Sequence, residues 1–206
     1  MLDNNIEVEI RGLIGNSEYP NIIALLQKTA KFIERKERVF IDYSTFLEGE
    51  GIKERNRDIR IRCTNGIPEI MIKVGAWGDG ENREEHSFKG TEGNFDELVQ
   101  IFGILGYEKG VLCVRRAEVF EFKDVEISII EVRNHSYYFE AEIMISSKRD
   151  KDKAILRLNG VLKELGLNKF SDAEFFKYVD KLNSEANEVF EYKNYKKGYF
   201  KKRFGI

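Results

Sequence analysis

The sequence predicts an α+β fold: a closed eight-stranded antiparallel β-barrel with helices packed outside. Three observations predict it. About eight stretches alternate apolar and polar residues at the period of a β-strand, four others repeat apolar residues at helical spacing, and several strands carry charged pairs on one face. Helices with an apolar stripe would cover the apolar face of the sheet, so the charged face would line the inside of the barrel.

The first strand shows the alternation most clearly. In residues 6–11, IEVEIR, successive side chains point to opposite faces, so Glu7, Glu9 and Arg11 share one face and three apolar residues share the other. Closing eight antiparallel strands removes their exposed edges and leaves room inside for a small ligand. The same alternation predicts strands over residues 6–14, 39–46, 58–63, 68–74, 83–88, 111–122, 125–132 and 137–146.

Four segments have the spacing of amphipathic helices. Residues 21–37 and 94–106 place apolar side chains three and four positions apart and lie between predicted strands. After SSKRDKDK the alternation stops, and residues 152–167 and 171–190 are predicted as two more helices, the second capped by Ser171. These helices would cover the apolar face of the sheet.

Charged side chains recur on one face of the middle strands. Arg60 and Arg62 share a face, Lys73 lies on the polar face of the next strand, and Arg116 is placed on the polar face of the sixth strand, with Arg115 among its apolar residues. A sheet with one solvated face gives such alternation in any single strand. The whole set, acidic on the first and last strands and basic between them, favours an enclosed charged channel.

The remaining strands complete this set. Glu140 and Glu142 share the polar face of the last strand, Arg83 lies on the fifth, and Ile130 is an unexpected apolar residue on the polar face of the seventh. Enclosed charges are costly unless they are paired or a charged ligand occupies the space. A polyanion with a divalent metal meets this need, because guanidinium groups match phosphate oxygens and carboxylates are the ligands that Mg²⁺ or Mn²⁺ prefers.

Composition sets further bounds. The 206 residues, 42% hydrophobic and with a net charge of −2, predict a single domain over residues 1–206, with the barrel at 4–146 and the C-terminal helices and tail at 150–206. There is no apolar run near 18 residues and no signal-peptide pattern after MLDNN, so a cytoplasmic protein is expected. Cys63 and Cys113 are expected to be buried free thiols, since two cysteines make neither a disulfide framework nor a four-thiolate zinc site.

In their order along the chain, the charged strands resemble the CYTH, or triphosphate tunnel metalloenzyme, superfamily. That family includes class IV adenylate cyclases, thiamine triphosphatases and inorganic triphosphatases. No single motif is specific, but the order is, and it covers residues 4–146. The matching residues are Glu7, Glu9 and Arg11 for the opening Glu-x-Glu-x-Lys motif, Arg60 and Arg62 for Arg-x-Arg, Lys73 and Arg116 for single basic positions, and Glu140 and Glu142 for the closing Glu-x-Glu.

The resemblance implies a metal-dependent enzyme that acts on a triphosphate-containing small molecule with Mg²⁺ or Mn²⁺ as cofactor. The implied catalytic residues are Glu9, Arg11 and Glu142. The implied phosphate-binding residues are Arg11, Arg60, Arg62, Lys73, Arg83 and Arg116. The implied metal ligands are Glu7, Glu9, Glu140 and Glu142.

Two positions depart from the family pattern. Arg11 stands where the family mostly has Lys, and a guanidinium group does not give up its proton to a base. Ile130 stands where many members have an inward-facing Asp, so the metal site would lack one carboxylate. Hydrolysis is favoured over cyclisation of ATP because the motifs define a phosphate cage and no adenine pocket, while a non-catalytic binder of polyphosphate or nucleotide stays open as an alternative.

The basic and aromatic tail allows two interpretations. Residues 191–206, EYKNYKKGYFKKRFGI, combine five Lys and one Arg with Tyr and Phe, a mixture that suits single-stranded nucleic acid. An aromatic latch on the barrel is favoured. No membrane partner is expected, and a homodimer is left open. His86 and His135 are expected to be ordinary surface or loop histidines.

Overall fold

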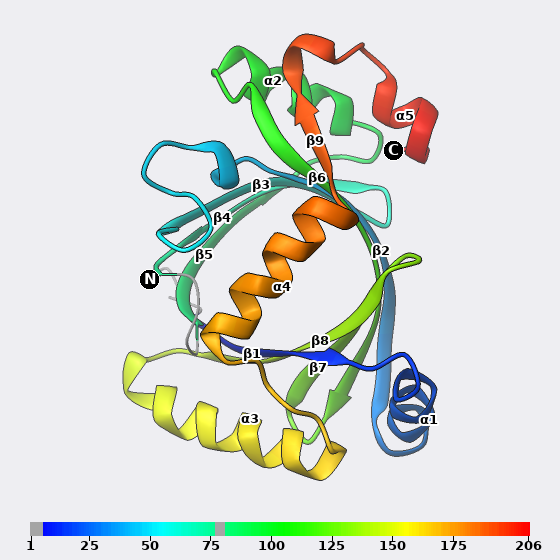
Figure 1. The fold of residues 1–206 in the computed structure, drawn as a ribbon, viewed down its shortest axis with the longest axis vertical. Coiled ribbons are helices and arrows are strands. Elements are labelled where there is room, and N and C mark those ends of the chain that lie inside the picture. The colour runs from blue at the N-terminus through cyan, green and yellow to red at the C-terminus, as the bar shows by residue number, and fades with distance from the viewer. Residues whose placement is uncertain (1–5, 77–80) are drawn as a thin grey trace.

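Eight strands close into an antiparallel barrel in a computed structural model that describes residues 6–76 and 81–206. The order around the barrel is β2-β3-β4-β5-β1-β8-β7-β6, and β6 pairs back with β2. The predicted fold class is therefore confirmed (Figure 1). The strands are β1 (Ile6–Ile14), β2 (Lys31–Asp42), β3 (Arg57–Thr64), β4 (Ile67–Val74), β5 (Glu81–Lys89), β6 (Lys109–Phe122), β7 (Val125–Val132) and β8 (Ser136–Ile145).

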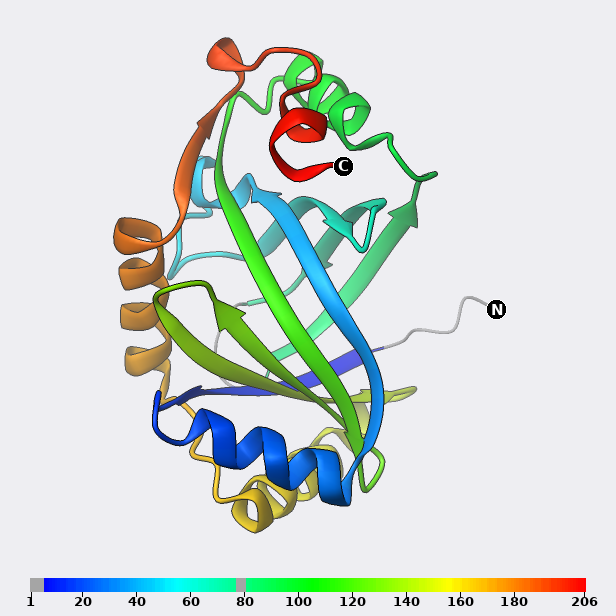
Figure 2. The ribbon, with the colours of Figure 1, turned by 90° about the vertical axis from the view of Figure 1, so that its right-hand side faces the viewer.

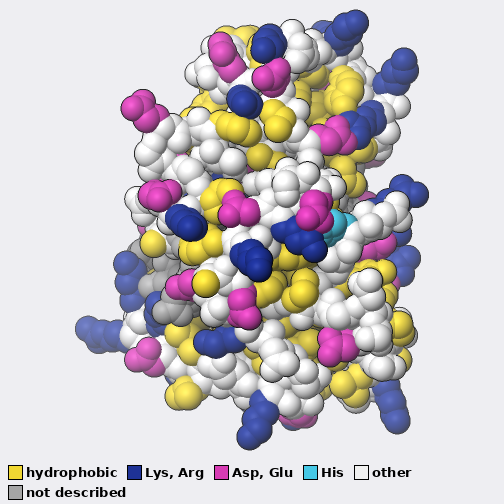
Figure 3. Space-filling model, viewed as in Figure 1, with side chains coloured by type: hydrophobic (Ala, Val, Ile, Leu, Met, Phe, Trp, Pro, Cys, Tyr) yellow, Lys and Arg dark blue, Asp and Glu magenta, His cyan; other side chains and the backbone are white. Residues whose placement is uncertain are grey.

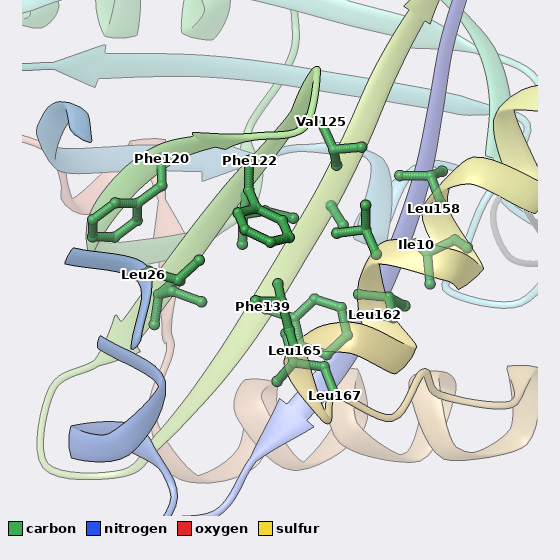
Figure 4. Close-up of a cluster of buried hydrophobic side chains, with 14 of the residues drawn as sticks. Ile10, Leu26, Phe120, Phe122, Val125, Phe139, Leu158, Leu162, Leu165 and Leu167 are labelled. Carbon is green, nitrogen blue, oxygen red and sulfur yellow. The ribbon is translucent and has the colours of Figure 1, made fainter. Parts of the chain in front are cut away.

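Two helices cover one outer side of the barrel. α1 (Tyr19–Thr29) and α3 (Lys151–Leu165) pack on the outward faces of β1, β6, β7 and β8. Ile10 and Phe139 contribute from the strands, and Leu26 and Leu162 from the helices (Figure 4). Because the apolar half of each alternating strand is used in this outer core, its charged half points into the barrel.

A second outer core lies at the opposite end of the molecule (Figure 2). α2 (Phe95–Ile104), α5 (Tyr199–Phe204) and the short strand β9 (Glu188–Glu191), which pairs with β6, cover the outer faces of β2 and β3. Phe200 is fully buried with its ring centroid 4.9 Å from that of Phe95, and the Tyr195 hydroxyl donates to Asp96 Oδ1 at 2.6 Å. The aromatic rings of the tail thus pack inward, as in the latch interpretation.

The remaining helix, α4 (Asp172–Glu185), crosses one opening of the barrel (Figure 1). Ser171 caps it in a capping box with Glu174, as the sequence predicts. Side chains of both signs are interspersed over this face of the molecule (Figure 3). Searched over the described residues, no helix is long and apolar enough to cross a membrane.

Two predicted helices end earlier than expected. α1 stops at Thr29, and the segment from Lys31 is not helical but the first half of β2, which pairs with β6 from Lys31 opposite Glu121 onward. The long partner strand offers a continuous ladder, which outweighs the local apolar spacing. α4 likewise ends at Glu185, because residues 188–191 pair with β6. Cys63 and Cys113 are buried free thiols, which confirms that prediction.

Candidate active site in the barrel channel

A cavity of about 170 Å³ lies inside the barrel and receives side chains from all eight strands. Its few uncharged members include Met71, Ile130 and Tyr138. The interior is therefore a charged channel with the apolar cores outside it. The charged lining consists of Glu7, Glu9, Arg11, Lys36, Arg38, Arg60, Arg62, Lys73, Glu85, Arg115, Glu126, Glu140 and Glu142.

Most residues predicted for the site meet in this channel. The cavity wall includes every predicted metal ligand and every predicted phosphate-binding residue except two. Arg83 is buried beside the wall, where its Nη1 donates to Asp58 Oδ2 at 3.1 Å. Arg116 is the second exception, and it lies outside the barrel.

The placement of Arg116 in the channel is wrong. Its Nε donates to Glu37 Oε1 at 2.6 Å, and both side chains are more than half exposed. The neighbouring Arg115 points inward instead and is 7% exposed. The sequence prediction set Arg115 aside because Cys113 and Ala117 share its face, but the barrel interior also accepts small apolar side chains. A charged arginine between two small residues on the same strand face was the feature of the sequence that could have identified Arg115 as a channel residue.

The sequence motifs also miss two channel residues, because Lys36 lies in the predicted helix of residues 21–37 and Arg38 lies between that helix and the strand predicted from residue 39. Lys36 Nζ lies 3.4 Å from Glu126 Oε1, and Arg38 Nε donates to Thr64 Oγ1 at 3.0 Å. With the corrected start of β2, the strand period of two places both on the inner face. The channel thus contains two cations that the sequence motifs do not predict.

The acidic side of the channel is a row of carboxylates across three strands. Glu9 of β1 lies opposite Glu142 of β8, which lies opposite Glu126 of β7. Burial, followed by the nearby charges of Glu7 and Glu126, raises the pKa of Glu142 to about 8. Burial also raises the pKa of Glu9 well above its ordinary value, despite the attraction of the guanidinium group beside it.

Cations already neutralise part of this row. Lys73 Nζ donates to Glu7 Oε2, and Arg11 donates to Glu9 Oε2 at 2.6 Å and to Glu140 Oε1 at 3.2 Å. Burial opposes ionisation of Glu7, but the charges of Lys73 and Arg11, together with hydrogen bonds to Glu9 and Lys73, hold the pKa of Glu7 well below its usual value. Lys73 and Arg11 are therefore paired with carboxylates on the acidic side of the channel.

A buried aspartate forms ion pairs with arginines on the basic side of the channel. Asp58 is fully buried and accepts from Arg60 Nε at 2.7 Å and Arg60 Nη2 at 2.5 Å, while Arg55 and Arg83 approach the same carboxylate. Burial alone would raise the pKa of Asp58, but the three guanidinium groups hold it well below its usual value. Arg60 also lies 5.3 Å from the centre of the Phe40 ring, so its planar head is held on two sides.

Comparisons with known proteins agree with this barrel and channel. No family model matches the chain. A Methanocaldococcus jannaschii protein named "Putative adenylate cyclase" is 26% identical over 165 residues, which are 80% of this chain and 91% of that protein. A solved Pyrococcus horikoshii structure matches with a TM-score of 0.69 at 21% identity, covering 85% of this chain and 98% of that one. A Vibrio parahaemolyticus structure described as a "putative adenylate cyclase" gives 0.59 at 14% identity, covering 83% and 92%.

The structural likenesses show a shared fold, and the sequence relative matches this chain over 165 residues. In the barrel these strands bring their charges into one channel in the family's order. The chain is similar to these proteins in sequence and in fold, and the order of charges on its strands resembles that of the CYTH superfamily. Both positions that depart from the family pattern lie in the channel wall: Arg11 bridges Glu9 and Glu140, and Ile130 is the apolar member of the β7 inner face.

The donor chemistry of this channel fits a hard divalent cation. Glu9 Oε1 is buried and has no hydrogen-bond partner among the described residues, so one carboxylate oxygen in the acidic row lacks a donor. Carboxylate oxygens are the ligands that Mg²⁺ and Mn²⁺ take. Over residues 6–76 and 81–206, no three Asp, Glu, His or Cys side chains are arranged to hold one ion, and Lys73 and Arg11 are hydrogen-bonded to Glu7 and Glu9.

Proposed function

We propose that the protein is a divalent-metal-dependent triphosphatase that cleaves the terminal phosphoanhydride bond of a triphosphate inside the channel. The observation that carries the proposal is the enclosure of two opposed walls, one of carboxylates and one of guanidinium and ammonium groups, in one cavity. Phosphoryl transfer depends mainly on positioning and on neutralising phosphate charge, which such walls supply without a nucleophilic side chain.

The basic wall would bind the phosphate chain. Arg60, Arg62 and Arg115 present planar donor groups that match phosphate oxygens, and Lys73 adds a point charge near the acidic row. Asp58 holds the Arg60 guanidinium group in one orientation before a ligand arrives. Preorganised positive charge of this kind stabilises the charge that develops on the phosphate oxygens in the transition state.

The acidic row would hold the metal ion. Glu9 and Glu142 are its central members, with Glu7 and Glu140 beside them. Mg²⁺ or Mn²⁺ supplies positive charge toward phosphate oxygens when it is bound. In hydrolysis, water attacks the terminal phosphorus, the bond to the bridging oxygen breaks, and orthophosphate leaves with a diphosphate product. The positively charged wall would orient the chain for this in-line attack.

A second candidate is an adenylate cyclase, which the names of the M. jannaschii and V. parahaemolyticus proteins favour. In that reaction the ribose 3′-hydroxyl attacks the α-phosphorus and pyrophosphate leaves. A binder without activity is the third candidate, because Arg11 and Ile130 depart from the family pattern. The same channel would serve all three.

One product assay separates these candidates. The protein is incubated with tripolyphosphate, ATP or thiamine triphosphate and with Mg²⁺ or Mn²⁺, and orthophosphate, pyrophosphate and cyclic AMP are measured. We expect orthophosphate from at least one substrate. Cyclic AMP with pyrophosphate would establish the cyclase instead, and tight binding without any product would establish the binder.

The two neighbouring arginines of β6 give a direct test of the channel. Replacing Arg115 by alanine removes an inward guanidinium group, and we expect the dissociation constant of tripolyphosphate to rise by roughly 10- to 100-fold, the value of a hydrogen bond to a charged group. Arg116→Ala is the matched control, because that side chain pairs with Glu37 outside the barrel. Isothermal titration measures both variants. An equal loss in the two would contradict the placement.

A further inference from the structure

A groove of about 520 Å³ lies along one side of α4 and is separate from the channel. We call it the outer groove. Its walls come from residues 13–16 at the end of β1, residues 135–136 of the β7–β8 turn, residues 168–170 before α4, and the face of α4 that carries Lys177 and Lys181 (Figure 1). Among the residues that the structure describes, none lines both this groove and the channel.

The wall of the outer groove is mainly apolar. Leu13 is 49% exposed there, and the buried Ile14 lies next to it. Phe170 and Tyr178 contribute two rings whose centroids are 5.4 Å apart. Small-molecule sites have volumes of about 300–1,000 Å³, and apolar groups form most of their walls. The outer groove can therefore accept the body of a small organic molecule.

Three ammonium groups line the same groove. Lys177 and Lys181 are one helical turn apart on α4, and Lys169 lies in the segment before the helix. Glu185 Oε2 lies 3.9 Å from Lys181 Nζ and 3.2 Å from His135 Nε2, whereas Lys169 and Lys177 form no ion pair in the described part of the chain. Like charges one turn apart repel each other, so an anion bound between them relieves this repulsion.

The carboxylate that lines the groove is already engaged. Glu174 Oε2 accepts from Ser171 N at 2.8 Å and from Ser171 Oγ at 2.7 Å, in the capping box of α4. Nearby, Ser136 Oγ lies 2.8 Å from the Tyr178 hydroxyl and connects the β7–β8 turn to the helix. The outer groove thus combines an apolar wall with positive charge that its own carboxylate does not balance.

We propose that the outer groove binds a small organic anion with an apolar body, such as a carboxylate or a sulfonate on an aromatic ring system. The body packs on Leu13, Phe170 and Tyr178, and the acidic group pairs with Lys169 and Lys177. The charge of the groove favours an anion, and its volume favours a small molecule. Because the groove shares no lining residue with the channel over the described residues, this inference does not rest on the proposed function.

The test compares two fluorescent probes that share one ring system: 8-anilinonaphthalene-1-sulfonate, which is an anion, and N-phenyl-1-naphthylamine, which is uncharged. Both fluoresce more strongly away from water, so titration of the full chain at pH 7 gives both dissociation constants. Lys169→Gln combined with Lys177→Gln removes two positive charges from the groove. We expect this double variant to bind the sulfonate roughly fivefold more weakly and to keep its affinity for the uncharged probe.

Three further variants sharpen the result. Lys163→Gln removes an exposed lysine of α3 outside the groove and should change neither affinity. Leu13→Ser shortens the half-exposed apolar wall and should weaken both probes. Asn183→Asp adds negative charge to a different cavity, of about 90 Å³, which lies between α4 and the barrel opening, and should leave both affinities unchanged.

Each alternative outcome has its own pattern. Unchanged sulfonate affinity in the double lysine variant overturns the inference, and so does failure of the wild-type protein to bind the sulfonate. Loss of sulfonate binding in Asn183→Asp alone would assign the probe to the cavity at the barrel opening and would also overturn it. Binding of a hexaglutamate peptide without either small probe would assign the groove to an acidic polypeptide instead. The product assay for triphosphates is independent of all these results.

Discussion

Replacing Glu142 by glutamine is expected to abolish turnover and leave the barrel folded. Glu142 is central in the carboxylate row, opposite Glu9, and an amide there cannot supply the negative charge that a divalent cation requires. We expect turnover to fall by at least about 100-fold, the scale on which a single electrostatic group acts in an active site. Orthophosphate release measures the loss, and circular dichroism reports on the fold.

Glu142→Gln is also expected to change how the free energy of unfolding depends on pH. The folded-state pKa of Glu142, about 8, lies above its ordinary value, so between the two values the folded protein holds a proton that the unfolded chain has lost. Wild-type stability therefore falls as the pH rises through this window. Glu142→Gln lacks this loss, so it should be more stable than the wild type at pH 9 and should converge with it near pH 4.

A matched control is Glu84→Gln, which changes an exposed carboxylate on β5. It should alter neither turnover nor the pH dependence of unfolding. Full activity of Glu142→Gln would remove that residue from the metal site. A stability curve parallel to that of the wild type would show that the carboxylate does not carry a raised pKa.

Replacing Asp58 by asparagine is expected to destabilise the protein by about 3–5 kcal/mol. The change leaves the buried guanidinium groups of Arg55 and Arg83 and the channel group of Arg60 without the carboxylate that they share. Removing one partner of a buried ion pair costs far more than the net value of the pair, because the remaining charge stays buried. Urea unfolding at pH 7 measures the change.

The fall in the free energy of unfolding at low pH gives a second measure of what Asp58 contributes to stability. Its pKa is lowered in the folded state, so its contribution is present above the unfolded-state pKa and is lost as the pH falls through lower values. Asp58→Asn should remove that part of the acid dependence. Asp124→Asn, at a side chain that is 96% exposed, is the control. A loss below about 1 kcal/mol for Asp58→Asn would show that the three arginines find other partners.

The alternation in β1 was enough to predict its two faces, because a strand buried on both sides of a barrel wall permits one register. In β6 the same reasoning failed. Arg115 shares a face with Cys113 and Ala117, and local sequence does not say which face of a strand is the enclosed one when small residues occur inside. For β2, the helical spacing around Phe32 competed with a pairing to β6, more than 80 residues away in the chain.

Other parts of the site depend on contacts that no local pattern encodes. Arg55 comes from the connection before β3, three residues from Asp58, and the folded chain brings it to Asp42 as well. The sequence predicts α4 from its cap and spacing but not its position across the barrel opening. The order of charges along the strands therefore predicts the channel. The ion pair that holds Arg60 in the channel wall and the aromatic residues under α4 depend on tertiary contacts.

Closure of the sheet through β2 and β6 constrains how this protein can change during evolution. Most barrel strands carry an outer residue of a hydrophobic core directly beside an inner residue of the channel, and among the described residues each of the eight barrel strands is paired on both sides. An insertion or deletion of one residue within a strand exchanges the two faces beyond it and damages stability and ligand binding together. Point substitutions, and length changes confined to the connections and the helix over the opening, are the routes left for altering specificity.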